Sequence, residues 1–353
     1  MVTMKTVLQL KLLPDSTQHA ALLETMRVFN EACNYIAEVA FREQCASKFV
    51  LQKRVYDDVR KQFGLSAQLT VRAIAKVVDA YKRDKSKQCF FKPTGAVVYD
   101  DRILSFKGLE AASILALQGR LAIPMQMGDY QRVQFGRGHG QADLVLVDGV
   151  FYLLVVIETP TAPPIQPKGF IGVDLGIVQI ATDSDGESFS GDTVENTRLR
   201  YHELRKALQS NGSRSARKHL QRIRRNESRF RRNQNHVISK RLVEKAKDTG
   251  RGIKLENLKH IRERTTVRKS DRAKHSGWAF FQLQSFIEYK AKRDGILVLY
   301  IDPRNTSRQC AVCGHVDKAN RKTQSRFQCV SCGHVANADE NAAVNIAARA
   351  NVN

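Results

Sequence analysis

The N-terminal 160 residues change their hydrophobic period twice. Residues 4–13, MKTVLQLKLL, alternate apolar and polar side chains, which is typical of a half-buried β-strand. Between residues 16 and 84, apolar residues recur at spacings of three and four and predict amphipathic helices. Residues 89–158 return to short apolar runs broken by glycine, among them RVQFGRG at 132–138, and a DG dipeptide between two longer runs predicts a hairpin. We therefore expect a β-barrel-like unit that a helical bundle interrupts.

The second half of the chain begins after a proline-rich segment. The stretch TPTAPPIQPKG, which ends at residue 169, holds four of the eight prolines and has no period, so we interpret it as a linker. The next residues, FIGVDLGIVQIATDSDGESFSG, predict strands that turn at Gly176 and at SDGES, and so a hairpin that opens an α/β domain. The pattern then predicts a helical stretch at 197–248, a strand at 252–258, a helix at 278–295, a strand at 296–302 and a closing helix after residue 334.

The net charge of the chain indicates what kind of partner it binds. The chain carries 58 Lys+Arg against 35 Asp+Glu, formally +23, with a pI of about 9.9. Such an excess costs self-repulsion unless a polyanion neutralises it, which favours a nucleic-acid partner over a basic protein without one. Residues 198–248 hold 17 Lys+Arg and 4 Asp+Glu, a surplus of 13, so we expect a phosphate-binding surface there. The basic residues that we expect to contact nucleic acid are Lys53, Arg54, Arg217, Arg224, Arg225, Arg231 and Arg232.

The sequence also bears on the location of the protein. No window approaches the roughly 18 consecutive apolar residues of a membrane span, so we expect no membrane partner. The first residues, MVTMKTVLQLKLLPDSTQ, lack the apolar core and small-residue cleavage site of a secretory signal. We therefore expect a cytoplasmic protein, and a monomer in preference to a dimer.

Four of the seven cysteines are spaced as C-x2-C-x15-C-x2-C, in CAVCGH and CVSCGH. Each pair forms a tight knuckle with both thiolates on one side, and two knuckles close a tetrahedral zinc site. A glycine follows each pair, where positive φ lets the knuckle turn back toward the metal. Two disulfides are the alternative, which a cytoplasmic location disfavours. We expect His315 and His334 to lie outside the ligand set, because the four thiolates satisfy structural zinc. The predicted zinc ligands are Cys310, Cys313, Cys329 and Cys332.

Three acidic residues occupy unusual positions. Asp174 lies within an apolar strand, where an isolated charge is costly unless it binds a cation or a donor, and Glu256 has a comparable place in IKLENL. Asp339 opens the last helix. Three carboxylates at one edge of a sheet would suit two Mg²⁺ or Mn²⁺ ions for phosphodiester hydrolysis. Each acid also has a simpler interpretation: a turn at Asp174 capped through the Gly176 amide, an ion pair of Glu256 with an arginine, and a helix N-cap at Asp339.

The order of these parts resembles the transposon-encoded TnpB (OrfB) family, whose relatives include compact type V CRISPR effectors. The segments GVDLGIVQIAT, IKLENL, TSRQCAVCG with FQCVSCG, and ADENAAVNIA occur in the family's order and spacing between residues 165 and 353. The N-terminal half is similar only loosely. The segment HVIS, residues 236–239, is similar to a recurring family segment, so His236 and Ser239 join the expected nucleic-acid contacts.

This resemblance implies a multidomain fold of α/β and β-barrel parts, and an RNA-guided endonuclease that cuts double-stranded DNA beside a short motif. Asp174, Glu256 and Asp339 fall on the family's catalytic, metal-binding positions, and the four cysteines fall on its zinc ligands. The implied partners are a guide RNA and target DNA, and the implied cofactors are structural Zn²⁺ and two Mg²⁺ or Mn²⁺ ions. The implied parts are a wedge β-barrel at 1–15 and 89–160, a helical recognition bundle at 16–88, a RuvC-like (RNase H-type) nuclease domain at 161–304 and 335–353, and an inserted zinc ribbon at 305–334.

Three other functions stay open on the sequence. A guided DNA-binding repressor without cleavage would keep the fold but lack an acid, whereas all three positions are filled here. A strand-joining transposase would need a catalytic tyrosine beside an H-x-H pair, which the chain lacks. An unguided nuclease or RNA-binding zinc-ribbon protein would copurify with no defined RNA. For the nuclease, we expect products with a 5′-phosphate and a 3′-hydroxyl.

Overall fold

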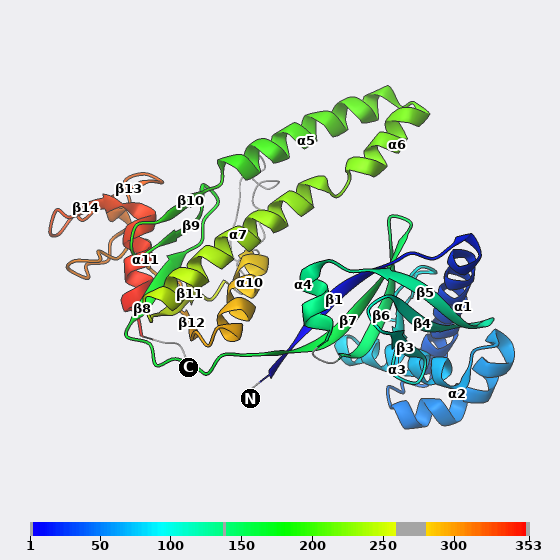
Figure 1. Ribbon diagram of the computed structural model, residues 1–353. Helices are drawn as coiled ribbons and strands as arrows, with labels where there is room; N and C mark the ends of the chain where they lie inside the picture. The colour runs from blue at the N-terminus through cyan, green and yellow to red at the C-terminus, as the bar shows by residue number, and fades with distance from the viewer. Residues whose placement is uncertain (1–2, 137–138, 259–279, 351–353) are drawn as a thin grey trace. The chain divides into compact units, whose positions relative to one another are not determined.

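The computed structural model describes residues 3–136, 139–258 and 280–350, and the chain divides into two compact units (Figure 1). The N-terminal unit is Thr3–Pro160, and the C-terminal unit begins at Thr161. The division lies within the predicted linker. Among the helices in the described ranges, none combines the length and the apolar character of a membrane span.

One seven-stranded antiparallel sheet organises the N-terminal unit and nearly closes into a barrel (Figure 1). The strand order is β2-β6-β7-β1-β5-β4-β3, so the predicted first strand, β1, lies in the middle and pairs with both β7 and β5. The predicted hairpin is confirmed, because Asp148 and Gly149 join β6 to β7 with φ of 52° and 80°. The strands are β1 (Thr3–Leu12), β2 (Val97–Tyr99), β3 (Leu104–Lys107), β4 (Ala111–Ala116), β5 (Gly119–Gln126), β6 (His139–Val147) and β7 (Val150–Pro160).

Three helices confirm the predicted helical insertion between β1 and β2. They are α1 (Ser16–Arg42), α2 (Lys48–Phe63) and α3 (Ala67–Arg83). Helix α1 begins at a capping box, in which the Gln18 N–H donates to Asp15 Oδ1 at 2.8 Å and Gln18 Oε1 accepts from the Asp15 N–H at 3.2 Å. Helix α2 ends at Gly64, whose φ of 64° suits a helix C-terminus. The apolar faces of these helices share one core with the sheet.

One predicted strand is wrong. The run RVQFGRG lies largely in a short helix, α4 (Asp129–Phe135), instead of a strand. The Gly128 N–H donates to Gln131 Oε1 at 2.7 Å at the start of this helix, and the Phe135 ring packs edge-on against Phe106 with centroids 4.7 Å apart. The segment is too short to show a helical period, so its alternating Val133 and Phe135 suggested a strand.

The C-terminal unit is built on a five-stranded mixed sheet with the order β10-β9-β8-β11-β12. Strands β8, β11 and β12 are parallel, and β9 and β10 run antiparallel to their neighbours, which confirms the predicted hairpin start and α/β pattern. Helices α7 and α10 cover one face, and α11 covers the other (Figure 1). The strands are β8 (Phe170–Asp174), β9 (Gln179–Asp183), β10 (Ser188–Ser190), β11 (Gly252–Glu256) and β12 (Val298–Ile301), and these helices are α7 (Asn226–Asp248), α10 (Phe280–Arg293) and α11 (Ala338–Ala348). Residues 278 and 279 of the predicted helix at 278–295 lie outside the described residues.

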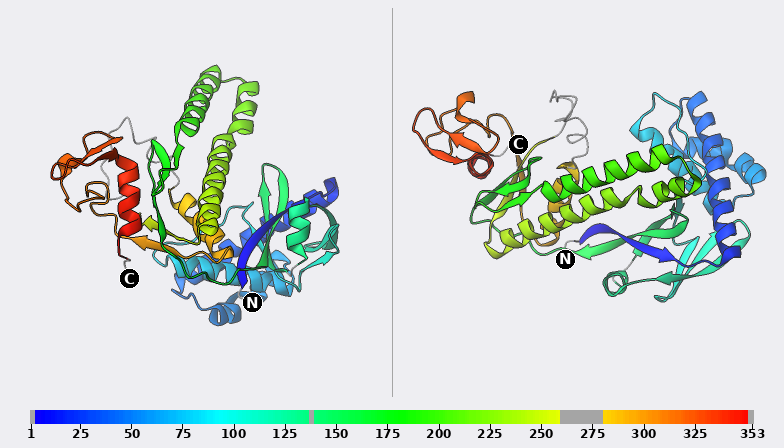
Figure 2. Two further views of the ribbon diagram at one scale, coloured as in Figure 1. Left: turned by 60° about the vertical axis from the view of Figure 1, so that its left-hand side comes forward. Right: turned by 90° about the horizontal axis from the view of Figure 1, so that it is seen from above.

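The basic stretch after β10 is helical, as predicted. Helices α5 (Asp192–Asn211) and α6 (Arg214–Ile223) precede α7, and Figure 2 shows that α5 and α7 extend from the sheet as a long hairpin. Helix α5 buries no residue, whereas the C-terminal half of α7 buries Ile238 and Leu242 against the sheet and α10. The outer part of the hairpin is therefore a surface, and only its base belongs to the core.

The cysteine-bearing segment lies between β12 and α11. It contains a short 3₁₀ helix, η1 (Lys318–Asn320), and a two-stranded hairpin of β13 (Arg326–Gln328) and β14 (Val335–Asn337). We call residues 305–334 the ribbon. Phe327, Cys310, Cys329 and Ala338 form a small core of its own.

Candidate functional site

The pairing of β8 with β11 places Asp174 and Glu256 side by side. Each is the last residue of its strand, and the two strands are parallel neighbours with Val173 opposite Leu255. Asp174 follows Val173 and Glu256 follows Leu255, so the acids occupy matching positions on the two strands. Neighbouring strands in a sheet are about 4.8 Å apart. Val173 and Leu255 belong to the core with α7 and α10. Because side chains alternate between faces, Asp174 and Glu256 point to the α11 face.

Gly172 allows α11 to lie directly on β8. A Cβ at this residue would lie 2.1 Å from the Ala343 backbone O and 2.4 Å from the Ala347 N, so only glycine admits the helix this closely. At the far end of α11, Lys254 Nζ donates to the Ala347 O at 3.1 Å and to the Arg349 O at 2.6 Å. The C-terminal end of α11 therefore lies beside Lys254, two residues before the end of β11, and its N-terminal end lies toward the strand ends.

Asp339 is one helical turn before Ala343, which brings it toward Asp174 and Glu256. It is not the helix N-cap. That role belongs to Asn337, whose Oδ1 accepts from the Asp339 N–H at 2.9 Å and from the Glu340 N–H at 3.3 Å. Asp339 is buried, with 8% of its surface exposed. The structure therefore brings the three predicted acids to one end of the sheet, on one face.

The acids repel one another. Burial, and then the negative charges of Glu256 and Asp339, raise the pKa of Asp174 to about 8, while the positive charge of Arg321 opposes the rise. Burial also raises the pKa of Glu256, against a hydrogen bond of 2.5 Å that Thr306 Oγ1 donates to its Oε1. The turn interpretation of Asp174 fails, because the Gly176 N–H donates to the Ile180 O. Glu256 has no ion pair among the described residues.

This arrangement suits a divalent cation, because half-buried and buried carboxylates that repel one another gain from a bound positive charge. Their spacing is looser than that of the cysteines. Within the described ranges, only the cysteine cluster brings three or more possible ligand atoms within 4.8 Å of one another. Asp174, Glu256 and Asp339 do not form a ligand group of this compactness in the described structure.

The four predicted zinc ligands form that compact cluster. Sγ of Cys310 lies 3.7 Å from that of Cys332, and Sγ of Cys313 lies 3.6 Å from that of Cys329, distances that fit thiolates around one ion and exclude disulfides. Backbone N–H groups, that of Cys332 first, lower the pKa of Cys329, whereas the neighbouring thiols raise the pKa of Cys332. Without a metal ion the four thiols therefore do not ionise alike.

The two knuckles have the same geometry. In each, the glycine N–H donates to the O of the first cysteine, at 2.9 Å for Gly314 and 3.1 Å for Gly333, and their φ angles are 74° and 73°. The N–H of each first cysteine donates to the following histidine O at 2.9 Å. His315 and His334 lie outside the thiolate cluster, as expected.

The predicted basic contacts lie in both units of the chain. Arg217, Arg224 and Arg232 are exposed on or beside α6 and α7, whereas Arg225 and Arg231 are half-buried there. Lys53 and Arg54 are exposed on α2, where Arg54 lies 3.8 Å from Glu43.

The structure gives Ser239 a different place from the one predicted. It is fully buried, its Oγ donates to the Asn235 O at 2.6 Å, and it accepts from Lys290 Nζ at 2.7 Å. His236 is half-buried and stacks on Phe286 with centroids 3.9 Å apart. The HVIS segment thus packs α7 against α10, and the Ser239 hydroxyl is not available to a nucleic acid.

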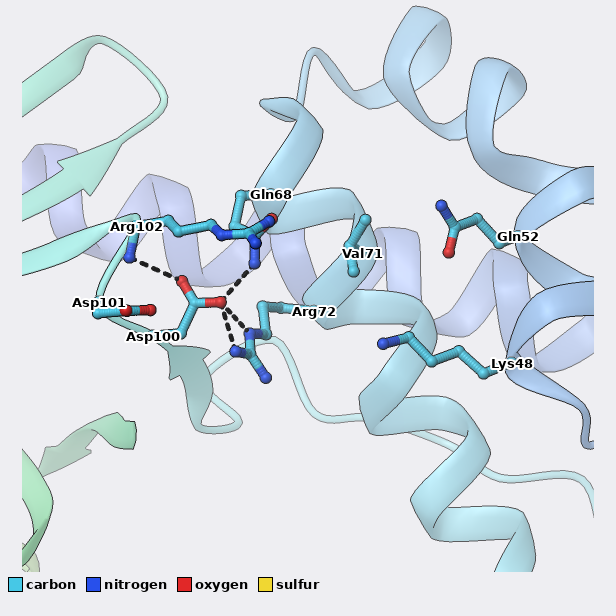
Figure 3. Close-up of a pocket in the computed structure, with 8 residues that line it drawn as sticks. All are labelled: Lys48, Gln52, Gln68, Val71, Arg72, Asp100, Asp101 and Arg102. Atoms are coloured by element: carbon cyan, nitrogen blue, oxygen red, sulfur yellow. Dashed lines mark hydrogen bonds and ion pairs between the residues drawn. The ribbon is translucent and has the colours of Figure 1, made fainter. Parts of the chain in front are cut away.

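A polar pocket of about 430 Å³ lies in the N-terminal unit (Figure 3). Asp100, at its base, accepts from Arg72 Nε at 2.9 Å and also from Gln68 Nε2. Lys48 and Gln52 project from α2 toward α3 on the other side (Figure 3). Sequence analysis missed this pocket. The spacing of Gln68 and Arg72 on one helix face was a signal, but their common partner lies 28 residues beyond Arg72.

Two family models match the C-terminal half of the chain. Residues 153–262 match the model of OrfB_IS605, described as a probable transposase, and residues 280–346 match the Cas12f1-like TNB domain. The first range contains Asp174 and Glu256, and the second contains the ribbon and Asp339. The chain is therefore a relative of transposon-encoded and CRISPR-associated proteins.

Curated relatives carry related names. The chain is 30% identical over 198 residues to the CRISPR-associated endodeoxyribonuclease Cas12f1 of Syntrophomonas palmitatica, which covers 51% of this chain and 39% of that protein. It is 34% identical over 194 residues to Cas12f1 of Sulfoacidibacillus thermotolerans (50% and 44%), and 44% identical over 80 residues to the TnpB-like protein MJ0751 of Methanocaldococcus jannaschii (22% and 29%). The matches span less than half the length of these three relatives. The resemblance to the TnpB (OrfB) family is confirmed.

The fold has close counterparts among solved structures. A Cas12f1 chain in complex with an sgRNA and target DNA superposes with a TM-score of 0.65 at 13% identity, over 98% of this chain and 99% of that chain. The mini-RNA-guided endonuclease CRISPR-Cas_phi3 gives a TM-score of 0.54 at 12% identity, over 98% and 92%. This likeness establishes the fold, while the predicted domain boundaries and the RuvC-like assignment stay predictions.

Proposed function

We propose that the protein is an RNA-guided endonuclease that cuts double-stranded DNA beside a short motif. One observation carries the proposal: three carboxylates from distant parts of the chain meet at the ends of β8 and β11 and the start of α11. Relatives named endodeoxyribonuclease share this half of the chain, and a structural neighbour was solved with guide RNA and target DNA.

Asp174, Glu256 and Asp339 would hold two Mg²⁺ or Mn²⁺ ions as a RuvC-like site. When bound, these ions would activate a water molecule and stabilise the leaving oxygen, which gives a 5′-phosphate and a 3′-hydroxyl. The chain contributes the position of each carboxylate. The sheet fixes Asp174, the Thr306 hydroxyl orients Glu256, and Asn337 fixes the turn that carries Asp339.

The helical hairpin of α5, α6 and α7 would bind the backbone of a guide RNA paired with a DNA strand. Residues 198–248, which make up most of the hairpin, hold a positive surplus of 13 out of the net +23, and Arg217, Arg224 and Arg232 are exposed there. Contacts of this kind recognise the shape and charge of a duplex, and base pairing supplies the sequence.

The polar pocket of the N-terminal unit would contact the DNA motif beside the target. Glutamine amides read adenine edges and arginine or lysine reads guanine edges, and both kinds of side chain line this pocket. Asp100 fixes Gln68 and Arg72, which limits the entropy lost when they bind a base.

The test is to express the protein with its own downstream genomic flank and to sequence any RNA that copurifies. The complex is then assayed with Mg²⁺ on a plasmid library, beside Asp174→Ala. A discrete RNA with cleavage that Asp174→Ala abolishes supports the proposal. A discrete RNA without cleavage in either protein would instead indicate a guided DNA-binding repressor, and the absence of a defined RNA would refute guidance.

A further inference from the structure

An exposed aromatic ring lies in the loop that joins α3 to β2 (Figure 1). Phe90 is 78% exposed, whereas its neighbours Cys89 and Phe91 are half-buried and pack against the core of the N-terminal unit. The two neighbours therefore attach the loop to the unit, and the ring between them is available to a ligand.

The backbone on both sides of this ring is held in place. Asn34 of α1 binds Phe91 twice, because its Oδ1 accepts from the Phe91 N–H at 2.7 Å and its Nδ2 donates to the Phe91 O at 3.0 Å. On the other side, the Cys89 N–H donates to the Tyr81 hydroxyl at 3.3 Å, and this hydroxyl donates to the Ala37 O at 2.9 Å. A ring whose backbone is already fixed loses little conformational entropy when a ligand stacks on it.

The loop is strongly basic. Residues 82–92 hold five Lys+Arg and a single acidic residue, Asp84. The Asp84 carboxylate is engaged by Ser86, whose N–H and hydroxyl both donate to its Oδ1, at 2.9 Å and 2.6 Å. Three exposed lysines beyond the end of α3 have no ion pair or hydrogen bond among the described residues: Lys85, Lys87 and Lys92.

These three lysines have no evident structural role. Lys82, in the last turn of α3, has one, because its Nζ lies 2.9 Å from Asp79 Oδ1 and a cation there stabilises the helix C-terminus. Lys87 and Lys92 lie outside the helix, three residues before and two residues after Phe90. Their Cα atoms are therefore within about 11 Å of that of Phe90. The loop offers free positive charge on both sides of the ring.

An exposed ring between free cations is typical of sites for single-stranded nucleic acid, in which the ring stacks on a base and the cations bind phosphates. The helical hairpin of α5, α6 and α7 has a different surface. It carries exposed arginines, but no phenylalanine, tyrosine or tryptophan is exposed among its described residues. The hairpin therefore suits the backbone of a duplex, and the loop suits a strand whose bases are unpaired.

We propose that this loop is a further nucleic-acid site, in which an unpaired nucleobase stacks on Phe90 while Lys85, Lys87 and Lys92 bind the neighbouring phosphates. The ligand is a single strand of RNA or of DNA, since both present the same base faces and phosphates. The site needs neither a guide nor a metal ion, so it goes beyond the proposed function.

The experiment measures binding of the full-length protein, purified free of nucleic acid, to labelled oligouridylate, to oligothymidylate and to a DNA duplex of the same length. Fluorescence anisotropy gives each affinity over a range of salt concentrations. The variants are Phe90→Ala, Phe90→Leu, Phe90→Trp and the double variant Lys85→Gln/Lys87→Gln. The matched control is Tyr130→Ala, because Tyr130 is 69% exposed on α4, a helix of the same unit that contains no lysine. Thermal unfolding checks that each variant is folded.

We expect Phe90→Ala to lower the affinity for a single strand about tenfold and to leave the affinity for the duplex unchanged. Phe90→Trp should match the wild type. Phe90→Leu should lose as much as Phe90→Ala, because leucine keeps apolar surface but has no ring to stack on a base. The double lysine variant should reduce the dependence of log affinity on log salt by about 0.7 per lysine. Tyr130→Ala should match the wild type.

A loss confined to oligouridylate would support an RNA strand as the ligand, and a loss confined to oligothymidylate would support a DNA strand. Single-strand affinities of Phe90→Ala within about twofold of the wild type would overturn the proposal. An equal loss on the duplex would also overturn it, and so would full affinity in Phe90→Leu, which fits an apolar contact with a protein instead. Because the assay uses no guide and no metal ion, failure of the proposed endonuclease activity leaves its result unaffected.

Discussion

Replacing Gly172 with alanine should separate α11 from the sheet and so misplace Asp339. The added Cβ would lie 2.1 Å from the Ala343 O, whereas an ordinary contact begins near 3.4 Å, so the helix must retreat by roughly 1.3 Å. The obstacle is backbone on a packed helix, which cannot rotate away as a side chain can. We expect a loss of about 1–3 kcal/mol in the free energy of unfolding.

The effect on cleavage should exceed the effect on folding. A displacement of about 1 Å at a reacting group can cost about 100-fold in rate, so Gly172→Ala should cleave about 100-fold more slowly at saturating Mg²⁺. The matched control is Gly169→Ala, because a Cβ at Gly169 meets nothing within 4 Å and the residue precedes the same strand. Thermal unfolding and single-turnover cleavage are measured on both guide-loaded proteins. Equal melting temperatures and equal rates for the two variants would refute the close approach of α11 to β8.

Three further perturbations test other parts of the structure. Cys313→Ser should release the zinc and slow cleavage even in excess Mg²⁺, which metal analysis and a cleavage assay check. Asp100→Asn should relax the preference for the motif without changing affinity for unrelated DNA, and an unchanged motif profile from a plasmid library would exclude the pocket as the reader. Burial lowers the pKa of Lys290 from 10.5 to about 8, so the folded protein releases this proton at a lower pH than the unfolded chain. Stability should therefore rise between pH 8 and pH 10 relative to Lys290→Met, as measured by thermal unfolding, and parallel curves for the two proteins would refute the shift.

Much of this architecture could be predicted from local pattern. Three local patterns predicted the structure correctly: the alternation in β1, the DG turn and the cysteine spacing. Each depends on residues close together in the sequence. The short helix α4 could not be predicted, because seven residues make fewer than two helical turns. Its Phe135 also packs on Phe106 of β3, a contact that the local sequence does not indicate.

The residue pattern marked the acids individually, and only the family resemblance predicted them as one site. An isolated charge in an apolar strand marks Asp174, yet its neighbours depend on the register of β8 with β11 and on the contact of α11 with Gly172. Ser239 shows the opposite error. Its segment resembles one in relatives, and the interpretation as a nucleic-acid contact failed because a shared segment can equally preserve a buried contact, here with Lys290.

The position of the ribbon in the chain makes it part of the carboxylate site. Its first turn supplies Thr306, which donates to Glu256, and its middle supplies Arg321, which donates to Asp339. The Ala338 N–H at the start of α11 also donates to the Ser325 O of the ribbon at 3.0 Å. Two of the three acids, Glu256 and Asp339, thus receive a hydrogen bond from the ribbon, whereas Asp174 receives none from it among the described residues. Since a segment of about 30 residues has a small core, a metal ion held by the four cysteines would stabilise the ribbon and, through it, the positions of Glu256 and Asp339.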